Sequence, residues 1–564
     1  MGDWRRQLRD IRRAMLDGSR AEGEGGRERT GEPRLPHRSD PVTNSQASFV
    51  DWVHEEAARA SKRSANRSER KGKRDRPSDD KTFRRAEPVS GTPDAETEPR
   101  PETRSPESPV FRPRVALKRP LAMPPWCEIG RSLQHPEHSQ GGAPMTVRIG
   151  VDFGTAFTKV AVRSGVDKIL VDWAAVTGDG SSVGRYVMPG LVCRTRKGEY
   201  GWLNAEGSEI HGNLKLPMIE DPGTDECPMA TLAHLAAVIR YARAYLYGHA
   251  DLGRKVASRT LRWELNIGCP TKPHENTEVV ARFRRLAQSG WKLAGMAHWG
   301  EKEIARAWKE TGFRGGLETD PGVIPEFVAQ IAGYIQSPQV RDDLHALVDI
   351  GAATIDVATF NVVLASRSDP LPKIPIFFSA VRAFGTHYLS YNRYRNLGLE
   401  PVWDDDAPVE STDSLAKRVG KDRHEIDVID AEFADSVARC IKSVVDGTRT
   451  NRHGYPRSEA WREGLPVFVT GGGAACELYR RAIRKAEEEM RRTIGLDSRF
   501  RFISLESFGI ASELLEKEAA LRTTTAIGLT EDAESIARVV PHRDIGPVTY
   551  RRATRVDRTD IYSD

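Results

Sequence analysis

Two stretches decide the fold of this 564-residue chain: VRIGVDFGTAFTKVAVR at 147–163 and ALVDIGAATIDVATFN at 346–361. Each runs from an apolar strand through Asp-x-Gly and a short segment of small and hydroxyl residues into a second apolar strand. This pattern predicts a β-hairpin closed by a tight turn at the glycine. The hairpin therefore occurs twice, with Asp152 and Asp349 at equivalent positions.

The turns of both hairpins carry residues suited to binding phosphate. Gly154 and Gly351 leave room for a ligand to approach the backbone closely. Backbone N–H groups in such turns, together with the hydroxyls of Thr155 and Thr354, can cradle phosphate oxygens. Two turns that face each other would hold a triphosphate from both sides.

The paired aspartates predict a metal site between the two turns. A carboxylate at the end of a buried strand is costly unless it is paired, hydrogen-bonded or close to a cation. Asp152 and Asp349 would hold a hydrated Mg²⁺, an ion that takes few carboxylates and keeps several waters. An isolated Asp-x-Gly-Thr is more often an ordinary tight turn, so it is the recurrence of the pattern that favours nucleotide binding.

A third glycine motif follows in LPVFVTGGGAACELYRR at 465–481. A strand runs into Gly471, Gly472 and Gly473 and then into a helix. Without side chains at these positions, a flat base or ribose can pack against the backbone, and the helix start adds N–H donors. No Lys-Ser/Thr pair follows, which excludes a Walker A loop. Alone, this motif is equally well a strand–helix turn.

In this order the three motifs resemble phosphate-1, phosphate-2 and adenosine of the superfamily that contains actin, the seventy-kilodalton heat-shock chaperones and the sugar kinases. The resemblance covers about residues 146–535. It implies an α/β, two-lobed actin-like ATPase fold, built from duplicated ribonuclease-H-like domains, with ATP and Mg²⁺ between the lobes. LRTTTAIGL at 521–529 resembles the connecting helix of this fold, where Ala526 and Gly528 would let two helices pack closely.

Further segments resemble the chaperone and actin branches at single residues. VIPEFVAQIAGYI at 323–335 resembles the chaperone's Pro-Glu-x-x-Ala-Ala helix, which implies that Glu326 positions the attacking water. The residue nearest to the chaperone's catalytic lysine is Lys215, followed here by Leu216 where the family has arginine. Lys159 resembles the lysine of actin and of plasmid-segregating actins that contacts the β-phosphate.

The chain also departs from the chaperone pattern. Ala352 and Ala353 replace glycines of phosphate-2, which makes this turn stiffer. The segment after the connecting helix is too short for a peptide-binding domain, so we expect no classical peptide refolding. Asp356 is expected to be structural within its own hairpin, and Lys442 is a weak candidate for approaching the adenosine.

Composition predicts four regions along the chain. They are a mostly disordered basic arm at 1–145, lobe I with phosphate-1 and an inserted subdomain at 146–345, lobe II with phosphate-2 and the adenosine motif at 346–535, and a polar tail at 536–564. The arm holds 29 lysines and arginines against 23 aspartates and glutamates, and the rest of the chain holds 56 against 57. The arm has too few apolar residues to offset chain entropy, apart from short patches around Trp4 and Trp52 that could dock on a partner.

The remaining composition excludes several classes of protein. No run of about eighteen apolar residues predicts a transmembrane helix, and the first sixteen residues lack the apolar region of a secretory signal. The six cysteines show no CxxC spacing, which favours reduced thiols and a cytoplasmic location. The histidines show no metal-ligand spacing, and no nucleophile–His–Asp constellation is evident.

The sequence predicts a slow, Mg-dependent ATPase that acts as a nucleotide-driven switch for a protein partner. Its catalytic residues would be Asp152, Glu326 and Asp349, and the partner would bind the arm or the lobe surfaces. One alternative is an actin-like protein that self-assembles into filaments, and another is a scaffold that binds nucleotide without hydrolysis. A small-molecule kinase is a weaker possibility because no acidic residue is placed to activate a hydroxyl. Arg-rich composition leaves open whether the arm contacts protein, lipid or nucleic acid.

Overall fold

The computed structural model describes residues 121–545 except for 139–140, 203–207, 216, 219–223, 271–273, 311–313, 368, 401–408, 451–459, 495–498, 506–516 and 533–535. All of these described residues belong to one compact unit, Pro113–Asp564. The patches predicted around Trp4 and Trp52, and most of the predicted polar tail, lie outside the described residues.

The first predicted hairpin forms the centre of a sheet with the strand order β3-β2-β1-β8-β9, in which β4 also pairs with β2. β1, β2 and β3 are antiparallel neighbours, and β8 and β9 continue the sheet in parallel on the other side of β1. Because β1 has a partner on each side, its second half is buried throughout. The strands are β1 (Pro144–Phe153), β2 (Phe157–Ser164), β3 (Asp167–Leu170), β4 (Met188–Pro189), β8 (Thr260–Cys269) and β9 (Gly322–Pro325).

The second predicted hairpin forms the centre of another sheet, ordered β14-β13-β10-β11-β12-β15. β10, β11 and β12 are antiparallel neighbours, and β13 and β14 pair in parallel beyond β10. The strands are β10 (Leu344–Ile350), β11 (Ile355–Asn361), β12 (Lys373–Arg382), β13 (Leu465–Thr470), β14 (Phe500–Ile503) and β15 (Arg538–Val540).

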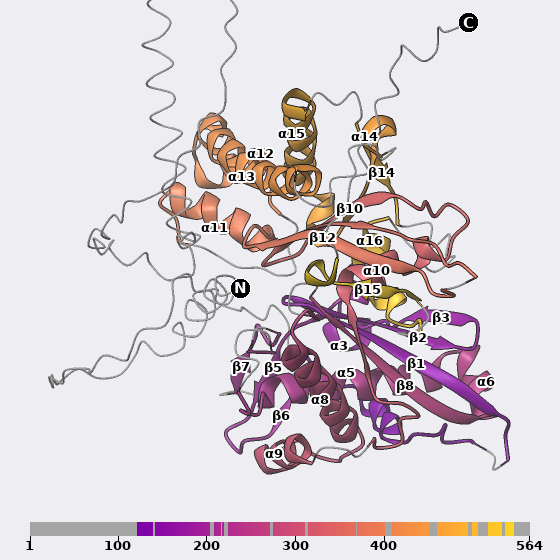
Figure 1. Cartoon of the computed structure of the whole chain (residues 1–564). Helices are drawn as coiled ribbons and strands as arrows, with labels where there is room; N and C mark the ends of the chain where they lie inside the picture. Colours follow the sequence, from indigo (N-terminus) through magenta and orange to yellow (C-terminus); the bar gives the residue numbers. More distant parts are fainter. Residues whose placement is uncertain are drawn as a thin grey trace, which may run out of the picture. The chain divides into compact units, whose positions relative to one another are not determined.

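The two sheets repeat one topology. In each, an antiparallel triplet is followed by two parallel strands, so that β1, β2, β3, β8 and β9 correspond to β10, β11, β12, β13 and β14 in both order and direction. This duplication confirms the predicted two-lobed α/β fold. Figure 1 shows the first lobe in indigo to magenta and the second in orange to yellow.

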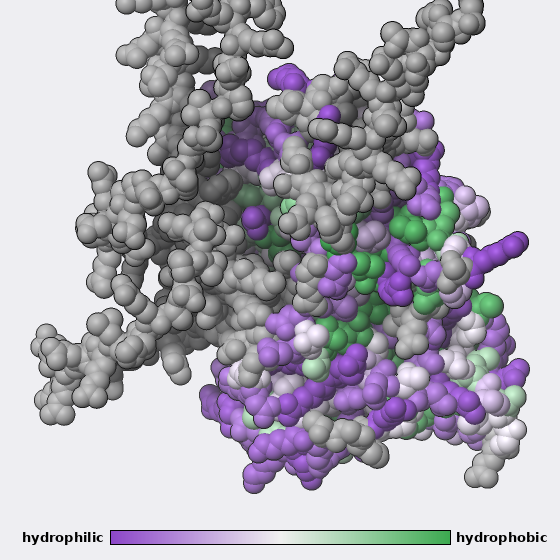
Figure 2. Space-filling model, viewed as in Figure 1, coloured by the Kyte–Doolittle hydropathy of each residue, from purple (hydrophilic) through white to green (hydrophobic). Residues whose placement is uncertain are grey.

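Helices cover each sheet. In the first lobe α5 packs against α8, and the face over α8 and α9 is mainly hydrophilic in Figure 2. In the second lobe α13 packs on β11, β12 and α15. The helices of the first lobe are α3 (Ala174–Thr177), α5 (Met229–Gly248), α6 (Leu252–Ala257), α8 (Thr277–Ala294) and α9 (Glu301–Lys309), with a small sheet of β5 (Val192–Arg194), β6 (Tyr200–Gly201) and β7 (Glu209–His211). Those of the second lobe are α11 (Thr386–Asn396), α12 (Thr412–Val419), α13 (Arg423–Thr450), α14 (Ala460–Glu463) and α15 (Glu477–Ile494).

An ordered turn of helix precedes the first sheet, within the segment predicted to be mostly disordered. This turn, η3 (Pro125–Arg131), packs on α5. Gly130 lies so close to α5 that an added Cβ would overlap the carbonyl oxygen of Arg240. The Arg243 side chain donates to the Gly130 carbonyl and stacks 3.5 Å from the centre of the Trp291 ring. A glycine and two arginines 110 residues away therefore give this short segment a docking site that its own composition does not reveal.

Two helices cross where the lobes are joined. α10 (Glu326–Ile335) leads from β9 toward β10, and α16 (Lys517–Gly528) leads back toward the first sheet; both lie between the two lobes in Figure 1. A Cβ added at Gly528 would overlap the backbone carbonyl of Ala329. The Ala526 carbonyl similarly occupies the space where Gly150 would carry a Cβ, at 2.7 Å. The close packing predicted for Ala526 and Gly528 is therefore present.

We expect Gly528→Ala to lower the free energy of unfolding by about 2 kcal/mol or more, because the added methyl group forces the crossing helices apart. Gly248→Ala is the matched control, since Gly248 also ends a helix but has open space around its Cβ position. This control should leave the stability unchanged or raise it by up to about 1 kcal/mol. Urea unfolding followed by circular dichroism measures both, and equal stabilities of the two variants would contradict the close crossing.

Candidate functional site

The two hairpin turns are closed by equivalent backbone hydrogen bonds. The N–H of Gly154 donates to the carbonyl of Phe157 at 3.1 Å, and the N–H of Gly351 donates to the carbonyl of Thr354 at 2.8 Å. A Cβ on Gly154 would overlap the Phe157 carbonyl oxygen, so the first turn requires glycine. Thr155 lies in the first turn, next to Gly154. The matching turns explain why the two sequences share Asp-x-Gly although their other turn residues differ.

Asp152 ends the first central strand and is neutralised by a lysine of the same hairpin. Its side chain is buried, and its Oδ2 atom lies 3.0 Å from the Nζ atom of Lys159. The two residues are direct cross-strand partners in the β1–β2 register. The structure thus brings Lys159 to the predicted metal ligand of the first turn.

Asp349, at the equivalent position of the second hairpin, has neutral partners. Its Oδ2 atom accepts a 3.0 Å hydrogen bond from Nε2 of Gln330, and its Oδ1 atom accepts one of 3.0 Å from the hydroxyl of Thr470. Burial raises the pKa of Asp349, and these two hydrogen bonds oppose the rise. Its cross-strand partner is Asp356, a second acid, whose pKa burial raises well above the ordinary value, with the neighbouring Asp349 charge adding to the rise. Sequence reasoning missed Gln330 and Thr470.

Glu326 is held by a buried lysine. It begins α10 directly after Pro325, and its Oε1 atom lies 2.5 Å from Nζ of Lys215, which is 6% exposed. Burial acts against the Lys215 ammonium, but Glu326 and Asp152 outweigh it and raise the pKa of Lys215. Burial also raises the pKa of Glu326, although Lys215 opposes this. The structure therefore pairs Lys215 with Glu326, a contact that the sequence did not predict.

The triple-glycine turn lies against the second hairpin. β13 runs parallel to β10 and sets Thr470 beside Asp349, so both chains emerge at the carboxyl edge of the sheet. Gly471 has φ 83°, and a Cβ there would overlap Oδ1 of Asp349. Gly472 and Gly473 begin the short helix η5 (Gly472–Ala475), in which Gly472 faces the guanidinium of Arg522 on α16. Packing therefore requires glycine at 471 and 473, whereas Gly472 makes only an ordinary contact.

The start of α11 supports the phosphate-2 turn, a contact that the sequence did not predict. The backbone N–H groups of Gly385, Thr386 and His387 donate to carbonyls of the 351–353 turn at 2.9–3.1 Å. A Cβ at Gly385 would overlap the carbonyl of Ala352. These bonds fix the turn from behind, in keeping with the stiffness that its two alanines add.

The site carries more acids than bases. It gathers four carboxylates and two lysines: Asp152, Glu326, Asp349, Asp356, Lys159 and Lys215. Among the described residues, no three His, Cys, Asp or Glu side chains converge as a metal-ligand set. The excess of carboxylates over lysines fits a cation, and Mg²⁺ takes few carboxylates and keeps several waters. Asp152 and Asp349 are the residues that would hold it through those waters.

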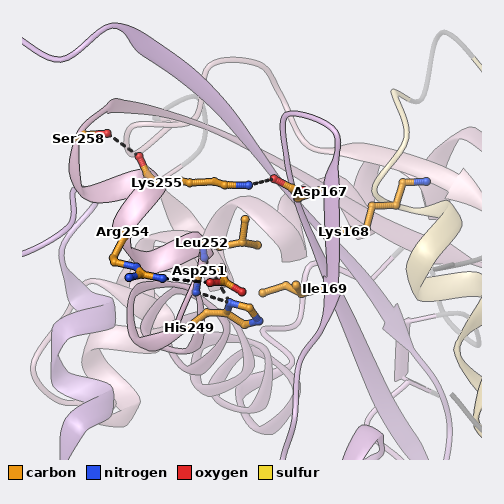
Figure 3. A pocket seen from close by; sticks show the side chains of 9 residues that line it. All are labelled: Asp167, Lys168, Ile169, His249, Asp251, Leu252, Arg254, Lys255 and Ser258. Carbon is orange, nitrogen blue, oxygen red and sulfur yellow. Dashed lines mark hydrogen bonds and ion pairs between the residues drawn. The ribbon is translucent and has the colours of Figure 1, made fainter. Parts of the chain in front are cut away.

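A larger hollow lies elsewhere on the first lobe and contains none of these residues. It has a volume of about 740 Å³ and opens between β3 and α6 (Figure 3). Its charges pair locally, with Lys255 2.8 Å from Asp167 and Arg254 3.1 Å from Asp251. No net charge is left in these pairs to attract a phosphate.

In the part of the chain that the structure covers, no helix has the length and apolar character needed to cross a membrane.

Comparison with known proteins finds only remote similarity. No family model matches the chain, and no curated protein matches it. Similar solved structures include ADP-bound MreB5 of Spiroplasma citri, at 13% identity over 68% of this chain and 95% of that chain, with a TM-score of 0.36. A MamK double helical filament is 14% identical over 67% of this chain and 97% of that chain, with a TM-score of 0.35. The ethanolamine utilization protein EutJ from Carboxydothermus hydrogenoformans is 14% identical over 72% of this chain and 98% of that chain, with a TM-score of 0.30. At such values these structures carry no argument about this chain; its two-lobed α/β architecture rests on the duplicated strand order.

We expect Asp356→Asn to stabilise the nucleotide-free protein at pH 8 by about 1 kcal/mol or more, the value of one pKa unit. A carboxyl whose pKa is raised in the folded state binds more protons there than in the unfolded chain. Wild-type stability therefore falls as pH rises from the ordinary Asp value of about 3.9 through the raised pKa, and the variant removes this loss.

Urea unfolding at pH 5, 6.5 and 8 tests this, with the exposed Asp342→Asn as control. The gain from Asp356→Asn should shrink as the pH falls. If the gain in the free energy of unfolding were independent of pH, or were shared by Asp342→Asn, the raised pKa of Asp356 would be contradicted.

Proposed function

We propose that this chain binds ATP with Mg²⁺ between its two hairpin turns and hydrolyses it slowly. The supporting observation is the meeting of Asp152, Asp349 and the Glu326–Lys215 pair, from both lobes, beside two like turns. Bound Mg²⁺ would supply positive charge to the phosphates and order water. The chain's own task would be positioning and charge stabilisation.

Each residue has a proposed task in this reaction. The N–H groups and hydroxyls at Thr155 and Thr354 would hold phosphate oxygens, and Lys159 would reach the β-phosphate. Glu326 would orient the attacking water and accept its proton, for which its raised pKa is suited. Lys215 keeps Glu326 in place and adds positive charge next to the reacting group. The turn at 471–473 would hold the nucleoside.

Nucleotide binding would act on the angle between the lobes. Ligands that contact both turns favour a closed arrangement, and the α10–α16 crossing is the place where the lobes are joined. Two arrangements of the lobes would present different surfaces to a protein partner. The proposal is therefore a nucleotide-driven switch in the cytoplasm, with the partner contacted through the lobe surfaces or the basic arm.

The first test is phosphate release from Mg·ATP by the full chain, compared with Asp349→Asn, Glu326→Gln and the control Asp342→Asn. Release should fall about a hundredfold or more in the first two variants, the usual contribution of a catalytic carboxylate, and persist in the control. If the wild type releases no phosphate but ATP raises its melting temperature, the chain is a nucleotide-binding scaffold. Absence of both effects would contradict the proposal.

A second candidate is an actin-like protein that self-assembles. It is favoured by Lys159, which lies 3.0 Å from Asp152 in the first turn, where actin and the plasmid-segregating actins carry their phosphate lysine. Sedimentation and electron microscopy with Mg·ATP, Mg·ADP and no nucleotide separate this candidate from the switch. We expect ATP-dependent polymers that Lys159→Met weakens if the filament function holds; monomers at all concentrations with intact phosphate release would leave only the switch.

A further inference from the structure

The two equivalent hairpins differ in the residue that faces the turn aspartate across the strands. Across the first, Asp152 faces Lys159, and the pair is neutral. Across the second, Asp349 faces Asp356, so two acids stand where the first hairpin has an acid and a base. Like charges directly opposed on neighbouring strands are destabilising. The second hairpin must stabilise its aspartate in another way.

Gln330 supplies that stabilisation from outside the hairpin. Its side chain is 6% exposed, and its amide nitrogen donates to Oδ2 of Asp349 while Thr470 donates to Oδ1. Both donors are neutral, so each carboxylate oxygen is oriented while the negative charge is kept. A lysine would cancel that charge, as Lys159 does at Asp152. Asp349 is thus held in place and left able to attract a cation.

The other end of the Gln330 amide faces a small cavity. Asp349 accepts from the NH₂ group, so the amide oxygen must point away from it. This oxygen has no hydrogen-bond partner among the described residues, and neither has Oδ1 of Asp356. Both residues line a cavity of about 10 Å³ together with Glu326, close to the smallest volume that holds a water. A single donor there would satisfy both acceptors and fix the amide's orientation.

Gln330 also connects the site to the helix crossing. Glu326, one turn earlier on α10, is paired with Lys215 of the first lobe, whereas Gln330 is bonded to Asp349 of the second. Ala329, between them, meets Gly528 of α16. One short helix therefore carries a contact to each lobe and the joint between them.

We propose that Gln330 is a positioning residue that takes the place of the missing cross-strand lysine. It orients the Asp349 carboxylate for a hydrated divalent cation without neutralising it, and transmits occupancy of that cation site to α10. This inference rests on the proposed Mg·ATP binding. It predicts that Gln330 governs the part of ATP affinity that depends on Mg²⁺.

The test measures ATP affinity of the full chain in Mg²⁺ and in EDTA. Gln330→Leu keeps the size and helix propensity but removes the amide N–H donor. Gln330→Glu keeps a polar side chain of the same length but also lacks this donor. The matched control is Gln336→Leu, at the exposed end of the same helix. We expect the gain in affinity from Mg²⁺ to fall about tenfold or more in both Gln330 variants, the usual effect of losing a hydrogen bond to a charged group. The ATP affinity of the Gln330 variants in EDTA should equal that of the wild type. Gln336→Leu should keep the wild-type affinity in both buffers.

A double-mutant cycle shows whether Gln330 acts through Asp349. Adding Gln330→Leu to Asp349→Asn should cause no further loss of the Mg²⁺ effect, because the partner it positions has already lost its charge. Additive losses, or a Gln330→Leu protein with the wild-type Mg²⁺ effect, would overturn the inference while leaving ATP binding intact. A wild type that binds no ATP in either buffer would instead overturn the proposed function and this inference with it. Circular dichroism on each variant separates unfolding from a specific loss.

Discussion

The structure depends on how it keeps carboxylates at the ends of two buried central strands. Asp152 and Asp349 each lie one residue before the end of the strand that has neighbours on both sides, so the sheet fixes where each carboxylate lies. A buried charge needs a partner nearby. The partners differ between the lobes. Asp152 pairs with Lys159, whereas Asp349 accepts hydrogen bonds from the neutral side chains of Gln330 and Thr470.

Several other features follow from that requirement. Because a hydroxyl must reach Asp349 from β13, β13 lies beside β10, and the glycine after it has no room for a side chain. Because Glu326 and Gln330 must reach different lobes, α10 has to pass between the sheets. It can do so only if α16 crosses it at a glycine. Gly471 and Gly528 are therefore required by close approach, the first to the Asp349 carboxylate and the second to the backbone of Ala329.

The hairpins, their turns and the duplicated fold could be predicted because their determinants are local. Each Asp-x-Gly pattern and its two strands lie within one short stretch, 147–163 or 346–361. The partner of Asp152 follows from the register of its hairpin alone. Lys215 is different: it lies 111 positions before Glu326, and only the tertiary fold brings the two together. Gln330 sits on a helix whose sequence shows four-residue spacing from Glu326 but not which strand that face meets. The helical turn at 125–131 was missed for the same reason, since its docking site consists of α5 side chains.

The lobes are consequently unequal in charge although they are equal in topology. The first presents Asp152 paired with Lys159, and the second presents Asp349, bonded to the neutral Gln330 and Thr470, opposite a second acid, Asp356. If the lobes close on a ligand as proposed, the acidic second turn would move toward the first, where Lys215 is paired with Glu326. Repulsion between these acids would then oppose closure without a ligand, and a cation between the turns would replace the repulsion by attraction. In such an arrangement the same uncompensated charge that destabilises the second hairpin makes the lobe angle sensitive to what is bound between the turns.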